Sequence, residues 1–305
     1  MQLNKAQMET HQFGIHPSII YTLITAQASG VDKALLELVM NSIDAGANRI
    51  DIEIDELGFV VRDNGRGFKD IETIKECFGI LGLPHAEGDA YYGRFRLGRM
   101  QTFGYAKTEW HTKNLKMIVD LNISPETESY GYEVVECDEY HQGCNITGIF
   151  YQDMFECDPN VDLSLIQNMS PYDVQNPIVA LAISVKYAPI DVYINGYRCN
   201  KRRDEVVPMA ITKKASYFLQ PASRVNSGAV YTINVFNKGV FAYTIDNAFF
   251  LGDIVSSENI SLNMARNEPK ATCGVHRSIK NKLFDLCDEL SASLNVVKTG
   301  KKEVD

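Results

Sequence analysis

The sequence predicts an α+β fold, a sandwich of helices and mainly antiparallel strands followed by a smaller α+β unit. An apolar helical pattern over residues 17–45 leads directly into a strand hairpin over 49–63. The next strand candidates then follow one another without intervening helices. This order argues against a doubly wound parallel sheet, in which strands and helices alternate.

The first elements are delimited by residues that cap or turn the chain. Asp32 is the expected N-cap of the long helix, and Gly46 is expected just beyond its end, where glycine tolerates a left-handed backbone. The stretch "RIDIEID" (49–55) alternates as a half-buried strand does. Glu56–Gly58 should form the hairpin turn and "FVVRD" (59–63) the second strand.

The remaining elements of the first unit follow from the same periodicities. Residues 70–79 predict a short helix, 80–93 predict a loop, and another helix should begin near residue 98. A mainly helical stretch is expected over 160–187. Strands are expected near 107–121, 130–136, 144–151 and 190–200, the last with a turn at Asn195-Gly196.

The pattern changes after "KRRDEVVP" (201–208), which predicts a domain boundary there. We assign residues 1–205 to the first domain, 206–297 to the second, and 298–305 to a disordered tail. The second domain should contain long strands over 209–219 and 229–245 and an amphipathic helix over 274–293.

The composition is typical of a soluble cytoplasmic protein. The 305 residues are 45% hydrophobic and 23% charged, and no run approaches the roughly 18 apolar residues that a membrane span needs. The N-terminus lacks the apolar core of a secretory signal. Seven cysteines without a CxxC pair favour free thiols over disulfides or zinc. The net charge of −9 disfavours nucleic-acid binding by the whole surface.

Three acidic or amide side chains share one face of the first helix. Glu37, Asn41 and Asp44 stand at positions i, i+4 and i+7. The stripe contains no lysine or arginine, although a solvated face usually mixes both signs of charge. The stripe therefore looks arranged to meet something other than water.

A second candidate site is "RDNGRGF" (62–68), where a strand delivers Asp63 to a glycine-rich turn. Gly65 and Gly67 let the backbone adopt positive φ and let a flat ligand approach without meeting a Cβ. A carboxylate there can accept a hydrogen bond from an exocyclic amine such as that of adenine. The plain alternative is an ordinary Asn-Gly turn.

A third candidate is "GRFRLGRMQTFGYA" (93–106), a glycine-flanked basic loop leading into the helix near residue 98. Backbone N–H groups at that helix start, with Arg94, Arg96 and Arg99, would form an anion site. The segment is no P-loop, and the plain alternative is a loop with solvated arginines. The other basic cluster, Lys201–Arg203, reads most simply as a solvated turn.

Together these segments resemble the GHKL superfamily of gyrase B subunits, heat-shock chaperones, histidine kinases and MutL-type repair proteins. "NSIDAGANRIDIEI" and "VVRDNGRGF" look most like MutL-type motifs, and "GCNITGIFYQD" (143–153) looks like the family strand with a Gly-Thr pair. "FFLGDIVSSENISLNMARNE" (249–268) resembles the middle-domain segment of HtpG-type chaperones. The resemblance implies a Bergerat-type α/β sandwich for ATP, followed by a transducer or middle-type domain.

The resemblance also implies roles for single residues. Glu37 matches the general base that activates water, and Asn41 matches the Mg²⁺ ligand. Asp63 would read the adenine amine, and Arg266 would reach from the second domain to the γ-phosphate. A carboxylate stripe without cations suits a Mg²⁺ ion that brings its own charge. The implied nucleotide-binding residues are Asn41, Asp44, Ala45, Asp63, Gly65, Gly67, Gly93, Arg94, Phe95, Arg96, Leu97, Gly98, Arg99 and Cys144.

Two positions depart from the family pattern. Arg96 stands where lids of this kind commonly have glycine. It cannot adopt glycine's conformations freely, and its guanidinium would instead donate to phosphate. Cys144 replaces the family threonine and removes a hydroxyl donor. Either Asn145 or Thr147 compensates, or a water network is rearranged.

The resemblance predicts a slow Mg-ATPase whose nucleotide state gates homodimerisation or a protein client. Two alternatives stay open: a binding module that uses ATP without turnover, and a MutL- or MORC-like factor associated with nucleic acid. A histidine kinase is disfavoured because no phospho-acceptor helix precedes the ATP-binding segment, and a topoisomerase because no cleavage domain is present.

Overall fold

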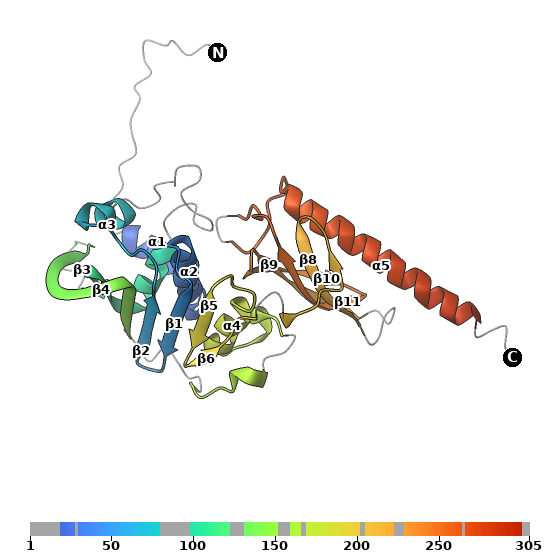
Figure 1. The fold of residues 1–305 in the computed structure, drawn as a ribbon, viewed down its shortest axis with the longest axis horizontal. Helices are drawn as coiled ribbons and strands as arrows, with labels where there is room; N and C mark the ends of the chain where they lie inside the picture. The colour runs from blue at the N-terminus through green and yellow to red at the C-terminus, as the bar shows by residue number, and fades with distance from the viewer. Residues whose placement is uncertain are drawn as a thin grey trace, which may run out of the picture.

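The computed structural model describes residues 19–27, 30–79, 98–122, 131–151, 159–165, 169–201, 205–222, 229–263 and 266–300. Within them the chain forms two α+β units side by side, each built on one sheet (Figure 1), which confirms the predicted fold class. No helix among these residues is both long and apolar enough to cross a membrane. The predicted loop over 80–93 and the segment before residue 19 lie outside the described residues.

The first unit contains a six-stranded sheet in the order β3-β4-β2-β1-β5-β6. All neighbouring strands pair antiparallel except β1 and β5, which are parallel. The strands predicted near 130–136 and 144–151 are parts of one long strand, β4. The six strands are β1 (Arg49–Ile54), β2 (Gly58–Asp63), β3 (Ala106–Val119), β4 (Glu133–Phe150), β5 (Asp191–Ile194) and β6 (Tyr197–Arg198).

The helical pattern predicted over 17–45 is divided into α1 (Ile19–Gln27) and α2 (Val31–Asp44). The predicted N-cap, Asp32, is wrong: α2 begins after Gly30, whose φ of 151° suits glycine, and no side chain caps it. The predicted end is confirmed. Gly46 has a φ of 76°, and the N–H groups of Gly46 and Ala47 bond to the carbonyls of Ile43 and Ser42, as in a Schellman motif.

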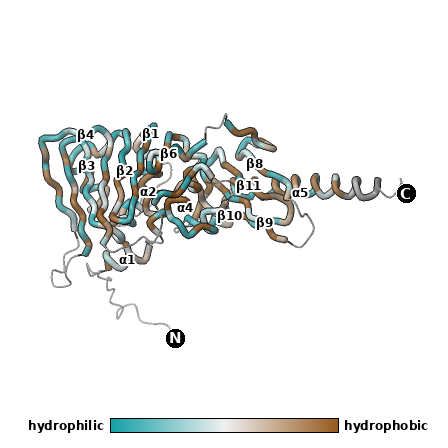
Figure 2. The backbone as a smooth tube through the Cα atoms, turned by 90° about the horizontal axis from the view of Figure 1, so that it is seen from below, coloured by the Kyte–Doolittle hydropathy of each residue, from teal (hydrophilic) through white to brown (hydrophobic). Residues whose placement is uncertain are grey.

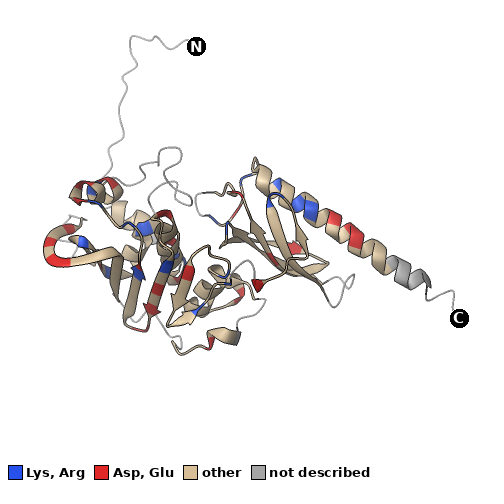
Figure 3. Cartoon of the chain, in the orientation of Figure 1, with Lys and Arg blue, Asp and Glu red and all other residues tan. Residues whose placement is uncertain are grey.

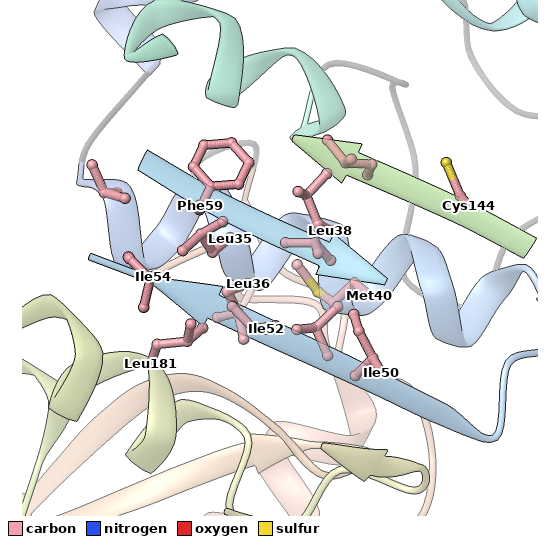
Figure 4. Close-up of a cluster of buried hydrophobic side chains, with 14 of the residues drawn as sticks. Leu35, Leu36, Leu38, Met40, Ile50, Ile52, Ile54, Phe59, Cys144 and Leu181 are labelled. Atoms are coloured by element: carbon pink, nitrogen blue, oxygen red, sulfur yellow. The ribbon is translucent and has the colours of Figure 1, made fainter. Parts of the chain in front are cut away.

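Helix α2 is buried against the sheet because most of its side chains are apolar. Leu35, Leu38 and Val39 are almost fully buried, and Figure 4 shows the leucines facing Ile50 and Ile52 of β1. Helix α4 (Pro177–Ser184) also packs on α2, and its buried side chains belong to the same hydrophobic core. This packing leaves a narrow polar edge of α2 for the site.

Of the other predictions for the first unit, two are confirmed and two need correction. Helix α3 (Ile71–Phe78) is confirmed, with Asp70 as its N-cap. The helix expected near residue 98 is a 3-10 helix, η2 (Gly98–Gly104). Among the described residues of the stretch 160–187, helix is confined to α4 and two single turns, η4 (Leu163–Leu165) and η5 (Pro171–Asp173). The Asn195-Gly196 turn is confirmed, with φ angles of 46° and 78°.

The second unit contains a five-stranded sheet in the order β10-β9-β11-β8-β7. The strand predicted over 229–245 is a hairpin, β9 and β10, and the one over 209–219 is divided into β7 and β8. Strand β11, which was not predicted, lies between β8 and β9 and runs parallel to β9. The strands are β7 (Ala210–Ile211), β8 (Ala215–Pro221), β9 (Tyr231–Asn237), β10 (Val240–Asn247) and β11 (Phe250–Ser256).

Helix α5 (Gly274–Gly300) covers this sheet and is longer than predicted. It passes residue 293 and includes 298–300, which were expected in the disordered tail. Its hydropathy alternates along the axis (Figure 2) because Ile279, Leu283 and Leu286 face the sheet. The exposed side carries basic and then acidic residues (Figure 3), and the far end projects beyond the sheet.

A buried polar cluster joins the two units. Asp253 of β11 is 2% exposed and accepts hydrogen bonds from Lys186 at 2.5 Å and from Tyr187 at 2.9 Å, both just after α4. Asn234 of β9 donates to the other carboxylate oxygen at 3.1 Å. The second sheet is therefore anchored to the first unit by charge as well as by packing. The predicted boundary after residue 205 stays a prediction, and it falls between β6 and β7.

Candidate functional site

The polar edge of α2 carries a buried carboxylate. Glu37 is only 7% exposed, and its Oε1 lies 2.9 Å from Nη1 of Arg266. Burial raises the pKa of Glu37, the positive charges of Arg266 and Arg99 oppose the rise, and the charge of Asp44 adds to it. The structure therefore brings the predicted base and the predicted arginine of the second unit into direct contact.

Arg266 approaches from a loop of the second unit, between β11 and α5. Its φ is 57°, a left-handed backbone that is uncommon for residues other than glycine. Its Nη1 also lies 3.2 Å from the sulfur of Met40, one turn along α2 from Glu37. The arginine is thus held against the base helix by a carboxylate and a thioether.

Gly98 lies against the other side of Glu37. A Cβ at Gly98 would collide with the Oε2 atom of Glu37, so only glycine lets η2 begin this close to the carboxylate. Arg99 follows, with its guanidinium 5.5 Å from the ring of Phe78 and its buried Nε without a hydrogen-bond partner. The predicted lid residues Gly93, Arg94, Phe95, Arg96 and Leu97 lie outside the described residues.

The side chain of Asn41 indicates whether this site suits a metal ion. It lies one turn along α2 from Glu37, and its buried Nδ2 has no hydrogen-bond partner among the residues that the structure describes. A buried amide without a partner is costly in a finished core, so the side chain fits a position that meets a ligand. Because the oxygen and nitrogen of an amide are exchanged by a simple flip, Asn41 can present its oxygen to a cation. The residues present therefore fit Mg²⁺ and a polyphosphate.

Asp63 ends β2 at the opposite end of α2 and is 8% exposed. Its Oδ1 accepts from the N–H of Gly65 at 2.8 Å, and its Oδ2 accepts from the hydroxyl of Ser42 at 2.9 Å. Burial raises the pKa of Asp63, and hydrogen bonds from Gly65, Ser42 and the Cys144 N–H partly oppose the rise. Ser42 is a site residue that sequence reasoning missed.

The two glycines of the turn after β2 are required by close packing. A Cβ at Gly67, whose φ is 61°, would collide with Thr112 Oγ1, a hydroxyl that donates to the carbonyl of Gly143. A Cβ at Gly65 would lie 3.0 Å from the Cβ of Ala45. Thr112 also accepts from the N–H of Phe68 at 3.1 Å, so this β3 residue holds the turn in place. Thr112 was not predicted.

The turn is also connected to the end of α2. The N–H of Arg66 donates to the carbonyl of Ala45 at 3.0 Å, and its Nη1 donates to the carbonyl of Asp44 at 2.8 Å. Asp44 and Ala45 therefore hold the turn that follows Asp63 through their backbone carbonyls, independently of their side chains. Helix α2 is the common support for both halves of the site.

Cys144 pairs with Asp63 across β2 and β4 and is buried. Burial and the nearby charge of Asp63 raise the pKa of Cys144 well above its usual value, so it stays a neutral thiol. Which group compensates for the missing threonine, Asn145, Thr147 or water, stays a prediction. Side chains alternate along a strand, and Asn145 and Thr147 both project from the opposite face to Cys144. A hydroxyl reaches Asp63 from Ser42 instead.

Comparison with known proteins relates part of this chain to a family of ATPases. Residues 29–139 match the family model described as "Histidine kinase-, DNA gyrase B-, and HSP90-like ATPase". That range includes Glu37, Asn41, Asp63 and Gly98 but ends before Cys144 and Arg266. No curated protein sequence matches the chain.

Two solved structures share the fold over both units. The ATPase region of Saccharomyces cerevisiae topoisomerase II is similar with a TM-score of 0.50 and 13% identity, over 85% of this chain and 86% of that chain. The same region bound to ICRF-187 (dexrazoxane) gives a TM-score of 0.51 and 12% identity over the same shares. Residues 29–139 are therefore similar to this ATPase family, and the solved structures show that the fold of both units is shared with an ATPase region.

Proposed function

We propose that this protein binds ATP with Mg²⁺ and hydrolyses it slowly. The observation that carries the proposal is the buried contact between Glu37 and Arg266, which places a carboxylate base and a cation from the second unit at one point. Asn41, with its buried Nδ2 unpaired, lies beside them on α2. Hydrolysis of a phosphoanhydride needs positioning and charge neutralisation more than a covalent nucleophile, and these residue types supply both.

Each residue has one role in the proposed reaction. The Asp63 carboxylate accepts a hydrogen bond from the adenine amine, with Ser42 and Gly65 holding it. Asn41 is the protein ligand of Mg²⁺, which neutralises charge on the phosphates when it is bound. Glu37 takes a proton from the attacking water, and Arg266 and Arg99 donate to the phosphate oxygens.

The position of Arg266 supports nucleotide-dependent gating. Because this arginine belongs to the second unit, a change in its partner on α2 changes the contact between the units. We infer that the nucleotide state controls a homodimer or an interaction with a protein client, as in HtpG-type chaperones. The six cysteines among the described residues are free thiols, which supports a reducing compartment such as the cytoplasm.

The alternative of a nucleic-acid-associated factor receives less support from the described residues. Arginines on the open face of the first sheet are engaged by acidic neighbours, for example Arg49 by Asp51 at 2.6 Å and Arg62 by Glu53 at 2.8 Å. Such paired guanidinium groups contribute little free charge for phosphates.

Glu37→Gln tests the proposed activity, because it keeps the shape of the side chain and removes the base. Steady-state turnover should fall by roughly 10²- to 10⁴-fold, the usual worth of general-base catalysis, while ATP still binds. Turnover in the variant at the wild-type rate would remove Glu37 as the base. Light scattering with Mg²⁺ and a non-hydrolysable ATP analogue, against ADP, tests gating of a homodimer: a dimer formed only with the analogue supports it, and one mass throughout contradicts it.

A further inference from the structure

Arg266 has an anionic partner in the structure. Its side chain is 27% exposed and pairs with the side chain of Glu37, which is 9% exposed. Water screens a contact of this kind poorly, so the attraction is much stronger than for an ion pair on the surface. Within the proposed function, the same guanidinium must also meet the γ-phosphate.

The two contacts of Arg266 use the same nitrogen. Nη1 is 2.9 Å from Glu37 Oε1 and 3.2 Å from Met40 Sδ. A thioether is a weak acceptor and does not offset the loss of a carboxylate. A guanidinium that turns toward a phosphate therefore gives up a charge-assisted hydrogen bond to Glu37.

Glu37 cannot serve as a base while it is held in this way. A carboxylate oxygen that accepts from Arg266 is directed at a cation and has less tendency to take a proton from water. Glu37 would still have a positive charge nearby if Arg266 moved away. The charge of Arg99 also acts on it, and Gly98 lets η2 stay close.

We propose that Glu37 and the terminal phosphate of the nucleotide compete for Arg266, so that the ion pair between the units is a built-in brake on the ATPase. The inference rests on the proposed function and extends it to regulation. A nucleoside triphosphate draws Arg266 away and frees the base in the same movement. A diphosphate has no terminal phosphate in that position, leaves the pair intact, and keeps the base inactive.

The competition sets the preference for triphosphate over diphosphate. Because Glu37 opposes only the contact made by the terminal phosphate, removing its charge should strengthen triphosphate binding and leave diphosphate binding nearly unchanged. This result differs from that of a merely structural ion pair, whose loss would affect both nucleotides alike.

Isothermal titration calorimetry of ADP and of the β,γ-imido analogue of ATP, with Mg²⁺, measures the ratio of the two dissociation constants. Glu37→Gln should raise the preference for the analogue about ten-fold, the effect of one charge-assisted hydrogen bond released to the phosphate. In an Arg266→Gln background the same change should have no effect on the ratio. Glu268→Gln, an exposed carboxylate on the Arg266 loop, is the matched control and should also leave it unchanged.

Each outcome has one meaning. An equal ratio in wild type and Glu37→Gln overturns the competition, and so does a rise that persists without Arg266. Failure of the wild-type protein to bind either nucleotide overturns the proposed function and the competition with it. A melting temperature for each variant shows whether it is folded, and Glu37→Asp, which keeps the charge, should restore much of the wild-type ratio.

Discussion

Asp63 is a buried carboxylate whose two oxygens already accept hydrogen bonds from Gly65 and Ser42. Burial raises its pKa above the ordinary aspartate value, so its acid form appears at a higher pH than in an unfolded chain. The folded state then binds the proton more tightly, and this group's contribution to stability increases as the pH falls. Ligand binding should depend on pH in the opposite sense.

Adenosine affinity should fall as the pH is lowered through the raised pKa of Asp63, because the protonated carboxyl is a poorer acceptor for the adenine amine. Adenosine is the right probe because it carries no phosphate that titrates itself. Equilibrium dialysis across mildly acidic to neutral pH measures the effect. Asp63→Asn should bind adenosine weakly at every pH, and a variant that retains both the affinity and its pH dependence would remove Asp63 as the adenine acceptor.

Ser42→Ala should show how much the missed hydroxyl contributes. Removing the donor leaves the Asp63 Oδ2 atom buried with one hydrogen bond fewer, at a cost of about 1–3 kcal/mol in unfolding free energy. Urea denaturation measures the change, and Ser42→Cys, which keeps the size, should not restore it. A variant as stable as wild type would show that another group satisfies the carboxylate.

At the level of residues, the sequence predicted those whose spacing is itself the signal. Glu37 and Asn41 share a face because helical geometry requires it. Ser42 could not be predicted, because a single serine in a helix gives no signal of its own. Its role depends on Asp63, which lies on a strand placed beside the helix in the folded chain. The sequence could not decide between Asn145, Thr147 and water, because the pairing register of β4 determines which side of the sheet a residue faces.

Among the elements, η2 is the one whose position depends most on a single glycine. Gly98→Ala would place a methyl group against Glu37 Oε2, and the carboxylate would be displaced from the position in which it could meet the attacking water. Turnover should fall by at least about ten-fold, since misplacing a reacting group by about 1 Å can cost a hundred-fold. Adenosine binding should stay the same.

Gly131→Ala is the matched control for that change, because a Cβ at Gly131 meets nothing within 4 Å. Its turnover should equal that of wild type in the same steady-state assay. If Gly98→Ala also turns over at the wild-type rate, the close approach of η2 to the base has no part in the reaction.

Helices and hairpins with local signals were predictable, and elements defined by distant partners were not. The end of α2 was predictable because Gly46 supports a local turn, and α3 because Asp70 caps it. The 3-10 form of η2 was not, because helical spacing alone does not separate it from an α-helix. Strand β11 was missed because its parallel partner β9 is separated from it by β10.

For the whole molecule, Asp253 connects the sheet that supports Arg266 with the core that supports α2. Asp253→Asn keeps the shape but leaves Lys186 without its counter-charge, at a cost of about 3 kcal/mol in unfolding free energy. Turnover should fall more than adenosine affinity, because the arginine and the base are held by different units. Thermal denaturation and the two functional assays together measure this.

Asp246→Asn is the matched control, since this aspartate is exposed on β10 of the same sheet. It should change stability by less than about 0.5 kcal/mol. If Asp253→Asn behaved like the control in all three measurements, the buried cluster would have no role in coupling the units.

The presence of a second group of strands after the first sheet could be predicted from the change of pattern near residue 205, and the boundary itself stays a prediction. The contact between the units could not be derived from periodicity. It brings Glu37 and Arg266 together from distant parts of the chain, and only the resemblance to a family suggested it.

Arg66, which links the Asp63 turn to the end of α2, affects how this part of the molecule fluctuates. Its two hydrogen bonds fasten the turn that carries Asp63 to the last turn of α2, and the Schellman bonds of Gly46 and Ala47 close the same point. Opening of the turn that carries Asp63 would therefore require the helix terminus to unwind with it. The amide protons of this junction should exchange with deuterium together and slowly, as one cooperative unit.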